Sequence, residues 1–197
     1  MFKLKISNLE EAVQLAQQWA THTVSILDAN VDYSSHAIEL PLEHEGNMLR
    51  RYFFHDIFLE EYIPPGLGQT PVFVTEHHIQ DILEFTAQLQ ADNHLLIHCH
   101  AGISRSTAVA CGVLCQHGLN PKEAVNTVFT LRSQALPNPR IIVLFDKLLS
   151  LEGELITITQ DISCALYGKD IALFYDKLMN TLLQNYDNQA SLKESWT

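Results

Sequence analysis

Residues 94–109, which read HLLIHCHAGISRSTAV, constrain this chain more than any other stretch. The apolar run at 95–97 predicts a buried strand, and the apolar run that follows Ser106 predicts a buried helix. Between them lie Cys99 and a short loop that carries one glycine, Gly102, and ends at Arg105. The segment therefore predicts a strand, a tight loop and a helix, with a cysteine and an arginine facing each other across the loop.

These residue types indicate a particular chemistry. Successive backbone N–H groups at the start of a helix form an electropositive nest that suits a phosphate-sized dianion. The guanidinium of Arg105 can bind two phosphate oxygens in one plane, and the same dipoles would stabilise a thiolate at Cys99 on the floor of the nest. A thiolate, an anion nest and an arginine clamp together indicate phosphoryl transfer through a cysteine.

The rest of the chain alternates strands with helices, which predicts an α/β fold with a central, mainly parallel sheet of four to five strands flanked by helices. The segment 57–74 contains several prolines and glycines and is expected to be a long loop, whereas 154–166 fits either a strand or a helix. We expect strands near 2–6, 21–27, 37–42, 49–54 and 95–98, and helices over 9–20, 75–90, 104–117, 121–132 and 140–151.

The domain organisation follows from length and from a change near Gly153. A chain of 197 residues is long enough for one well-buried domain and short for two. We expect residues 1–152 to form a catalytic domain. Residues 153–197, with an apolar helical stripe over 171–183, are expected to be an extension that packs on the same domain or forms an interface.

Charge and cysteine usage limit the partners. The formal charge of −11 and the pI near 5.2 argue against nucleic acid or an anionic membrane surface as a partner. The N-terminus shows no signal-peptide pattern, and no apolar run reaches the length of a membrane span. The four cysteines show no disulfide-scaffold spacing. We therefore expect a cytoplasmic protein, although a secreted effector without a classical signal would look the same.

Paired histidines raise the question of a metal site. His98 and His100 flank Cys99, and His77 adjoins His78. Neighbouring residues on a strand point to opposite faces, so His98 and Cys99 cannot easily bind one ion. No metal and no cofactor are expected.

Residues 98–106, HCHAGISRS, resemble the signature loop of the cysteine-dependent protein tyrosine phosphatases, and most of all its dual-specificity branch. The resemblance implies the protein tyrosine phosphatase fold over roughly Thr21 to Leu151. The motifs Thr-His-x-Val-x-x-Leu at 21–27 and Phe-His-Asp-Ile at 54–57 are similar to those of small bacterial-type members.

The resemblance implies roles for residues within the loop. Cys99 would be the nucleophile that forms a phosphocysteine, Ser106 would help the sulfur to leave, and His98 would order the loop from behind and help to stabilise the thiolate. The phosphate would be bound by the Arg105 side chain and by the backbone amides of His100, Ala101, Gly102, Ile103, Ser104 and Arg105.

The resemblance also implies residues outside the loop. A leaving alkoxide needs a proton, and Asp56 is the best candidate for the general acid, with Glu60 and Glu61 as alternatives. Arg132 resembles an arginine at the pocket rim, and Asn138 a residue that supports the loop.

The implied activity is hydrolysis of phosphomonoesters on protein, on phosphotyrosine and also on phosphoserine or phosphothreonine. Two alternatives stay open. One keeps the mechanism and changes the substrate to a phosphoinositide or another non-protein phosphate. The other is a phosphate-binding pseudophosphatase that keeps the nest without turnover.

Overall fold

A computed structural model describes residues 1–35, 38–59, 63, 70–168, 180, 181 and 184. Four strands form one sheet in the order β1-β4-β2-β3, and every neighbouring pair is parallel. The predicted α/β fold is therefore confirmed. The elements are β1 Lys3–Ser7, α1 Leu9–Gln18, β2 His22–Leu27, β3 Met48–Phe53, α2 Glu76–Thr86, β4 His94–His98, α3 Arg105–Gln116, α4 Pro121–Leu131, α5 Pro139–Leu148 and α6 Glu154–Tyr167.

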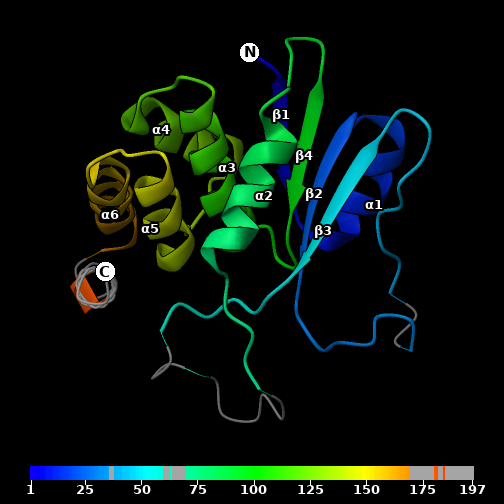
Figure 1. The fold of residues 1–197 in the computed structure, drawn as a ribbon, viewed down its shortest axis with the longest axis horizontal. Coiled ribbons are helices and arrows are strands. Elements are labelled where there is room, and N and C mark those ends of the chain that lie inside the picture. The colour runs from blue at the N-terminus through cyan, green and yellow to red at the C-terminus, as the bar shows by residue number, and fades with distance from the viewer. Residues whose placement is uncertain (36–37, 60–62, 64–69, 169–179, 182–183, 185–197) are drawn as a thin grey trace, which may run out of the picture.

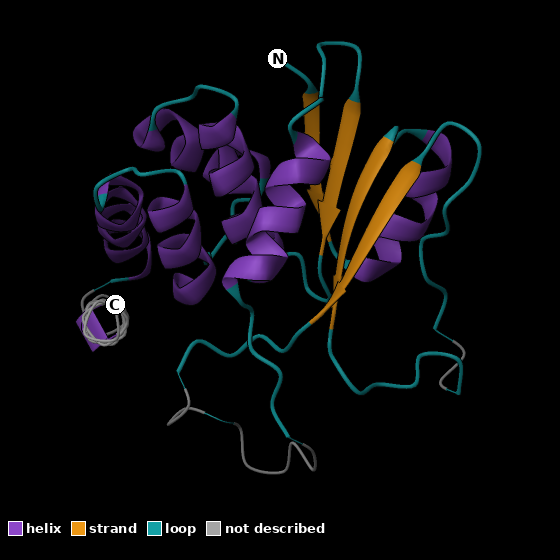
Figure 2. Ribbon diagram, in the orientation of Figure 1, coloured by secondary structure: helices purple, strands orange, loops and turns teal. Residues whose placement is uncertain are grey.

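Helices cover both faces of the sheet (Figures 1 and 2). Helix α1 lies on one face, where its small residues Ala12 and Ala16 pack against Leu96 of β4. Helices α2 and α3 lie on the other face, α4 and α5 pack against α3, and α6 packs against α4 and α5. Successive residues of a strand point to opposite faces, so Leu95 and Ile97 enter the larger core on the α3 side.

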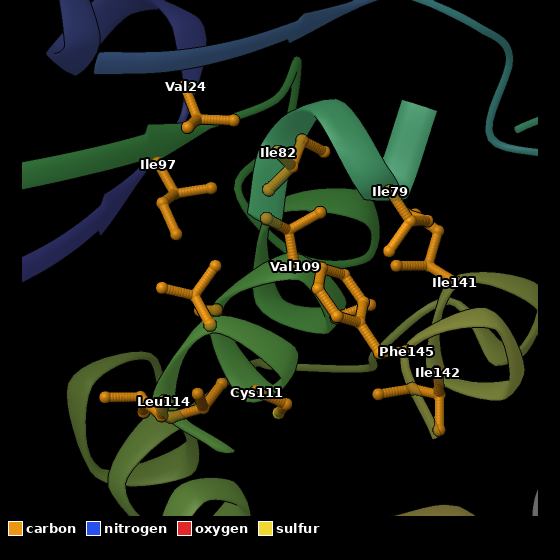
Figure 3. Packing of buried hydrophobic residues seen from close by; sticks show 14 of the residues in the cluster. Val24, Ile79, Ile82, Ile97, Val109, Cys111, Leu114, Ile141, Ile142 and Phe145 are labelled. Carbon is orange, nitrogen blue, oxygen red and sulfur yellow. The ribbon is translucent and has the colours of Figure 1, made fainter. Parts of the chain in front are cut away.

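The larger core is centred on α3, which is buried along most of its length. Figure 3 shows Val109 of α3 between Ile97 of the sheet and Phe145 of α5. The helices α3 and α5 approach closely at Gly112, where an added Cβ would lie 2.1 Å from the ring of Phe145. Close packing of this kind holds the first turn of α3, and the loop before it, in a defined position.

Two helix ends differ from the sequence-based expectation by three residues or more. The helix predicted to reach residue 90 ends at Thr86, whose hydroxyl oxygen lies 2.8 Å from the carbonyl oxygen of Ile82 and 2.7 Å from Oε1 of Gln116. The amide of Gln90 donates to the Asn93 side chain instead of continuing the helix. The helix predicted to reach residue 151 ends at Leu148, and Ser150 follows with a positive φ of 54°.

The segment that fits either a strand or a helix is the helix α6. Its N-cap is Gly153, which has no side chain to cap the helix. The carboxylate of Asp146 on α5 does so instead, and it accepts from the amides of Gly153, Leu155 and Ile156 at 2.8, 3.0 and 3.4 Å. The division of the chain at residue 152 remains a prediction, and the apolar stripe at 171–183 lies almost wholly outside the described residues.

The strand expected at 37–42 is wrong for the part that the structure describes, since residues 38–42 form no strand. Pro41 has no N–H to give to a sheet, and its carbonyl oxygen accepts from Nη2 of Arg51 on β3 instead. Across the described ranges, no helix is both long and apolar enough to cross a membrane.

Candidate active site

Cys99 lies at the carboxyl end of β4, where the chain turns through the loop 99–104 into α3. The residue is 1% exposed. The Gly102 amide donates to Sγ of Cys99 at 3.2 Å, and the Ser106 hydroxyl lies 3.2 Å from the same sulfur. The N-terminus of a twelve-residue helix therefore begins beside a buried sulfur that two polar groups already contact.

The carbonyl groups of the loop bond to the surrounding elements. The carbonyl oxygens of His100 and Ile103 accept from the amides of Leu9 and Leu136 at 3.1 and 2.9 Å, and that of Ser104 accepts from the Asn138 amide at 3.3 Å. In a trans peptide the C=O and the following N–H point in opposite directions. The N–H groups of Ala101, Ser104 and Arg105 therefore point away from these partners, and the Gly102 amide donates to Sγ of Cys99.

Gly102 allows the loop to lie against the junction of β1 and α1. Its φ is +70°, and an added Cβ would come within 2.6 Å of the Ser7 carbonyl carbon and 2.7 Å of the Asn8 nitrogen. Arg132 donates from Nε to the Gly102 carbonyl at 3.2 Å and from Nη1 to Glu11 at 3.2 Å. The junction and Arg132 together hold the turn at Gly102 in place. The role of Arg132 at the pocket rim stays a prediction.

Arg105 is anchored through one corner of its guanidinium. Nη1 donates to the Phe54 carbonyl oxygen and to the carboxylate of Asp28, both at 2.8 Å, and the Arg105 side chain is 4% exposed. Its Nε–H is buried and has no hydrogen-bond partner in the structure as described. A buried donor without a partner is costly, so a bound oxyanion that accepts from Nε would satisfy it.

Asp56 follows β3 and reaches the loop. Its Oδ1 accepts from the Ser104 hydroxyl and from Nδ2 of Asn138, both at 2.8 Å, while the residue as a whole is exposed. The structure thus brings Asp56 and Asn138 to the loop that carries Cys99. The alternatives Glu60 and Glu61 lie outside the described residues.

His98 is fully buried behind the loop. Its Nδ1 lies 3.5 Å from the Cys99 carbonyl oxygen, and its Nε2 has no partner in the described structure. Burial, with a smaller contribution from the charges of Arg51 and Arg105, lowers the pKa of His98 to about 4. The ring is therefore neutral near pH 7, so it can order the loop but adds no positive charge beside the sulfur.

Sequence reasoning missed two residues of this site. The carboxylate of Asp28 pairs with Arg105, and Asp28 is not among the predicted site residues. Glu11, which holds Arg132, is not among them either. The position of Asp28 beside the loop could have been predicted from the sequence. The carboxyl ends of parallel strands meet at one edge of a sheet, and both β2 and β4 end there. No group of three His, Cys, Asp or Glu side chains in the described ranges is arranged for a metal ion.

Comparison with known proteins identifies solved structures that share this fold. No family model matches the chain, and no curated protein sequence matches it. Three similar solved structures illustrate the likeness. Human DUSP28 is 22% identical over 76% of this chain and 92% of its own, with a TM-score of 0.55. A mouse dual specificity phosphatase complexed with zinc tungstate is 21% identical over 79% of this chain and 86% of its own, with a TM-score of 0.54. PTPMT1 in complex with PI(5)P is 16% identical over 77% of this chain and 94% of its own, with a TM-score of 0.50. The chain has the fold of the dual-specificity phosphatases.

Proposed function

We propose that this chain, which has the dual-specificity phosphatase fold, hydrolyses phosphomonoesters on protein through a phosphocysteine at Cys99. Phosphotyrosine is the main substrate, with phosphoserine and phosphothreonine also accepted. The observation that carries the proposal is the loop geometry, in which Sγ of Cys99 lies 3.2 Å from the Gly102 amide and from the Ser106 hydroxyl, at the start of α3. A reaction through a free thiol suits a reducing compartment such as the cytoplasm.

In the first step the Cys99 thiolate attacks phosphorus in line with the leaving oxygen, and the P–O bond breaks as the S–P bond forms. The loop amides and the Arg105 guanidinium bind the three equatorial oxygens, whose charge they stabilise in the transition state. Asp28 and the Phe54 carbonyl oxygen hold Nη1 of Arg105, which fixes the guanidinium before substrate arrives.

Asp56 gives its proton to the leaving oxygen, and the same carboxylate then removes a proton from the water that attacks the phosphocysteine. Its bonds to Ser104 and Asn138 keep it at the loop. As the S–P bond breaks in this second step, the hydroxyl of Ser106 stabilises the sulfur that leaves.

Turnover of para-nitrophenyl phosphate tests the reaction. Cys99→Ser should abolish it, because a serine hydroxyl is a far weaker nucleophile near neutral pH than a thiolate. Cys115→Ser is the matched control, since Cys115 lies on α3 away from the loop and should keep its turnover. A parent protein that binds tungstate but turns nothing over would be a pseudophosphatase.

The role of Asp56 is tested by the dependence on the leaving group. Asp56→Asn should lower kcat about 100-fold for phenyl phosphate, a poor leaving group, and far less for para-nitrophenyl phosphate, which needs little protonation. The control is Ser104→Ala, which removes one hydrogen bond to Asp56 and leaves the charge unchanged. A change of Asn138 to aspartate would add a charge and is not used. Equal, small losses of Asp56→Asn on both substrates would contradict the assignment and direct attention to Glu60 and Glu61.

The phosphoinositide alternative has one observation in its favour, the fold likeness to PTPMT1 in complex with PI(5)P. The formal charge of −11 weighs against a polyanionic substrate. Parallel assays of a phosphotyrosine peptide, a phosphothreonine peptide and a soluble short-chain PI(5)P distinguish the classes by kcat/KM. A higher value for PI(5)P than for either peptide would overturn the protein assignment.

A further inference from the structure

A cavity of about 480 Å³ lies beside the loop, outside the phosphate nest. One wall is formed by His100 and Ala101, the first two residues after Cys99, and another by the start of α1. Residues 38 and 39 close a third side. This volume is within the range of pockets that take a small ligand or a large side chain. Because Cys99 and the wall belong to one short loop, a group in the cavity would lie close to the phosphorylated residue.

Four of the described residues that line the cavity are apolar, namely Leu9, Val13, Ile38 and Ala101. Three of these residues come from separate parts of the chain: α1, the loop before β3, and the loop after β4. These apolar residues suit an aliphatic segment, while Asn8, His100 and two glutamates form the polar part of the lining.

The charges that line the cavity are both negative. Glu10, in the first turn of α1, and Glu39 line it, and both are exposed. Neither forms an ion pair with any residue that the structure describes, whereas the neighbouring Glu11 is paired with Arg132. Among the described residues that line the cavity there is no lysine or arginine. The two glutamates are therefore available to a cation from outside.

We propose that this cavity is a substrate subsite for a basic side chain, arginine or lysine, within two residues of the phosphorylated residue. The inference rests on the proposed phosphatase function and specifies its substrate class. Lysine and arginine carry a charged head on an aliphatic stem, and they bury the stem along apolar surface while the head stays at the rim. Here the stem would lie on Leu9, Val13 and Ile38, and the head would meet Glu10 and Glu39.

Chain geometry sets the reach of the subsite. An extended peptide advances about 3.3 Å per residue, so the two residues on either side of a phosphotyrosine lie within about 7 Å of it. The side chains of these neighbours are long enough to enter a cavity that shares a wall with the nest. A polyphosphorylated inositol ring would instead bring negative charge to Glu10 and Glu39, which is unfavourable. The cavity therefore favours a peptide over a phosphoinositide.

Phosphotyrosine peptides that differ at one position test the subsite. Arginine, leucine or glutamate is placed in turn at each of the four positions nearest the phosphotyrosine, and kcat/KM is measured at low and at 0.5 M salt. At one position or more, arginine should exceed glutamate about fivefold to tenfold, the range that exposed ion pairs with two carboxylates provide. The preference should shrink at high salt because exposed charges are screened.

Variants then assign the preference to the cavity. Glu10→Gln with Glu39→Gln should remove the preference for arginine. The matched control, Glu123→Gln with Asp161→Asn, changes the net charge equally on α4 and α6 and should keep it. Each peptide value is divided by the same variant's turnover of para-nitrophenyl phosphate, which has no flanking residues, so a general loss of activity cancels.

Several results would overturn the proposal. Equal hydrolysis of all peptides, a preference for leucine over arginine, or a preference that survives in the Glu10 and Glu39 variant would each exclude a basic subsite while leaving the phosphatase intact. Faster hydrolysis of soluble PI(5)P than of every peptide would exclude a peptide subsite. Absence of any turnover of para-nitrophenyl phosphate by the parent would overturn the proposed function itself, and the subsite with it.

Discussion

Replacing Gly102 with alanine should damage both the stability of the protein and the loop that carries Cys99. The φ of +70° at Gly102 is one that L-residues adopt at a cost of about 1 kcal/mol. The new Cβ would also lie 2.6 Å from the Ser7 carbonyl carbon and 2.7 Å from the Asn8 nitrogen. Both are backbone atoms, so neither can move aside by changing a rotamer.

The magnitude follows from adding these two costs. Forcing a methyl group into a packed region costs about 1–3 kcal/mol, so Gly102→Ala should lose about 2–4 kcal/mol of unfolding free energy in total. The matched control is Gly118→Ala. Gly118 has a φ of +90° and nothing within 4 Å of an added Cβ, so it should lose only about 1 kcal/mol.

The assays are urea unfolding followed by far-UV circular dichroism, and turnover of para-nitrophenyl phosphate. Relief of the clash must move the loop away from Ser7, and a displacement of about 1 Å at a catalytic centre can cost 100-fold in rate. Gly102→Ala should therefore lose about 100-fold or more in kcat/KM, and Gly118→Ala should keep its activity. Equal midpoints in urea and equal turnover for the two variants would refute the reasoning from the close approach at Gly102.

Two further predictions concern charge. Asp28→Asn removes the counter-charge of the buried Arg105 and should cost about 1–3 kcal/mol of unfolding free energy, less than a fully buried pair because Asp28 is 32% exposed. Added phosphate should raise the melting temperature of this variant more than that of the parent. An unfolding free energy equal to that of the parent would contradict the pairing. His98 has a pKa lowered to about 4, so the unfolded chain takes up its proton first as the pH falls. Between pH 6.5 and 5 this residue should lower the unfolding free energy by about 2 kcal/mol. His98→Gln should lose that part of the pH dependence, as measured by urea unfolding. A slope of unfolding free energy against pH that is the same in the variant and the parent would count against a buried neutral ring.

The central segment could be predicted from the sequence because its signals are local. The apolar run at 95–97, the glycine at 102 and the apolar run after Ser106 lie within a few residues of the elements they specify. The start of α4 was equally clear, since Asn120 caps the helix and Pro121 occupies its first position. Signals of this kind need no knowledge of the tertiary structure.

Other features depend on contacts between distant segments. The cap of α6 is Asp146, which belongs to α5, so the segment itself carries no side-chain cap at Gly153. Asp28 meets Arg105 only because β2 and β4 are neighbours in the sheet. The cavity beside the loop likewise combines residues of α1 with residues 38 and 39. These contacts depend on the order of the strands in the sheet, which the pattern of apolar and polar residues along the chain does not predict.

The pairing of β1 with β4 has a consequence for how the protein folds. Lys3 pairs with His94 and Ser7 with His98, so strands separated by roughly ninety residues must meet before the sheet is complete. The same meeting brings Ser7 and Leu9 against Gly102 and His100. Contacts of such high sequence separation form slowly, because a long loop must close before they are made. The segment 3–9 therefore packs late against the loop that carries Cys99, and a refolding chain should acquire its helices well before its activity.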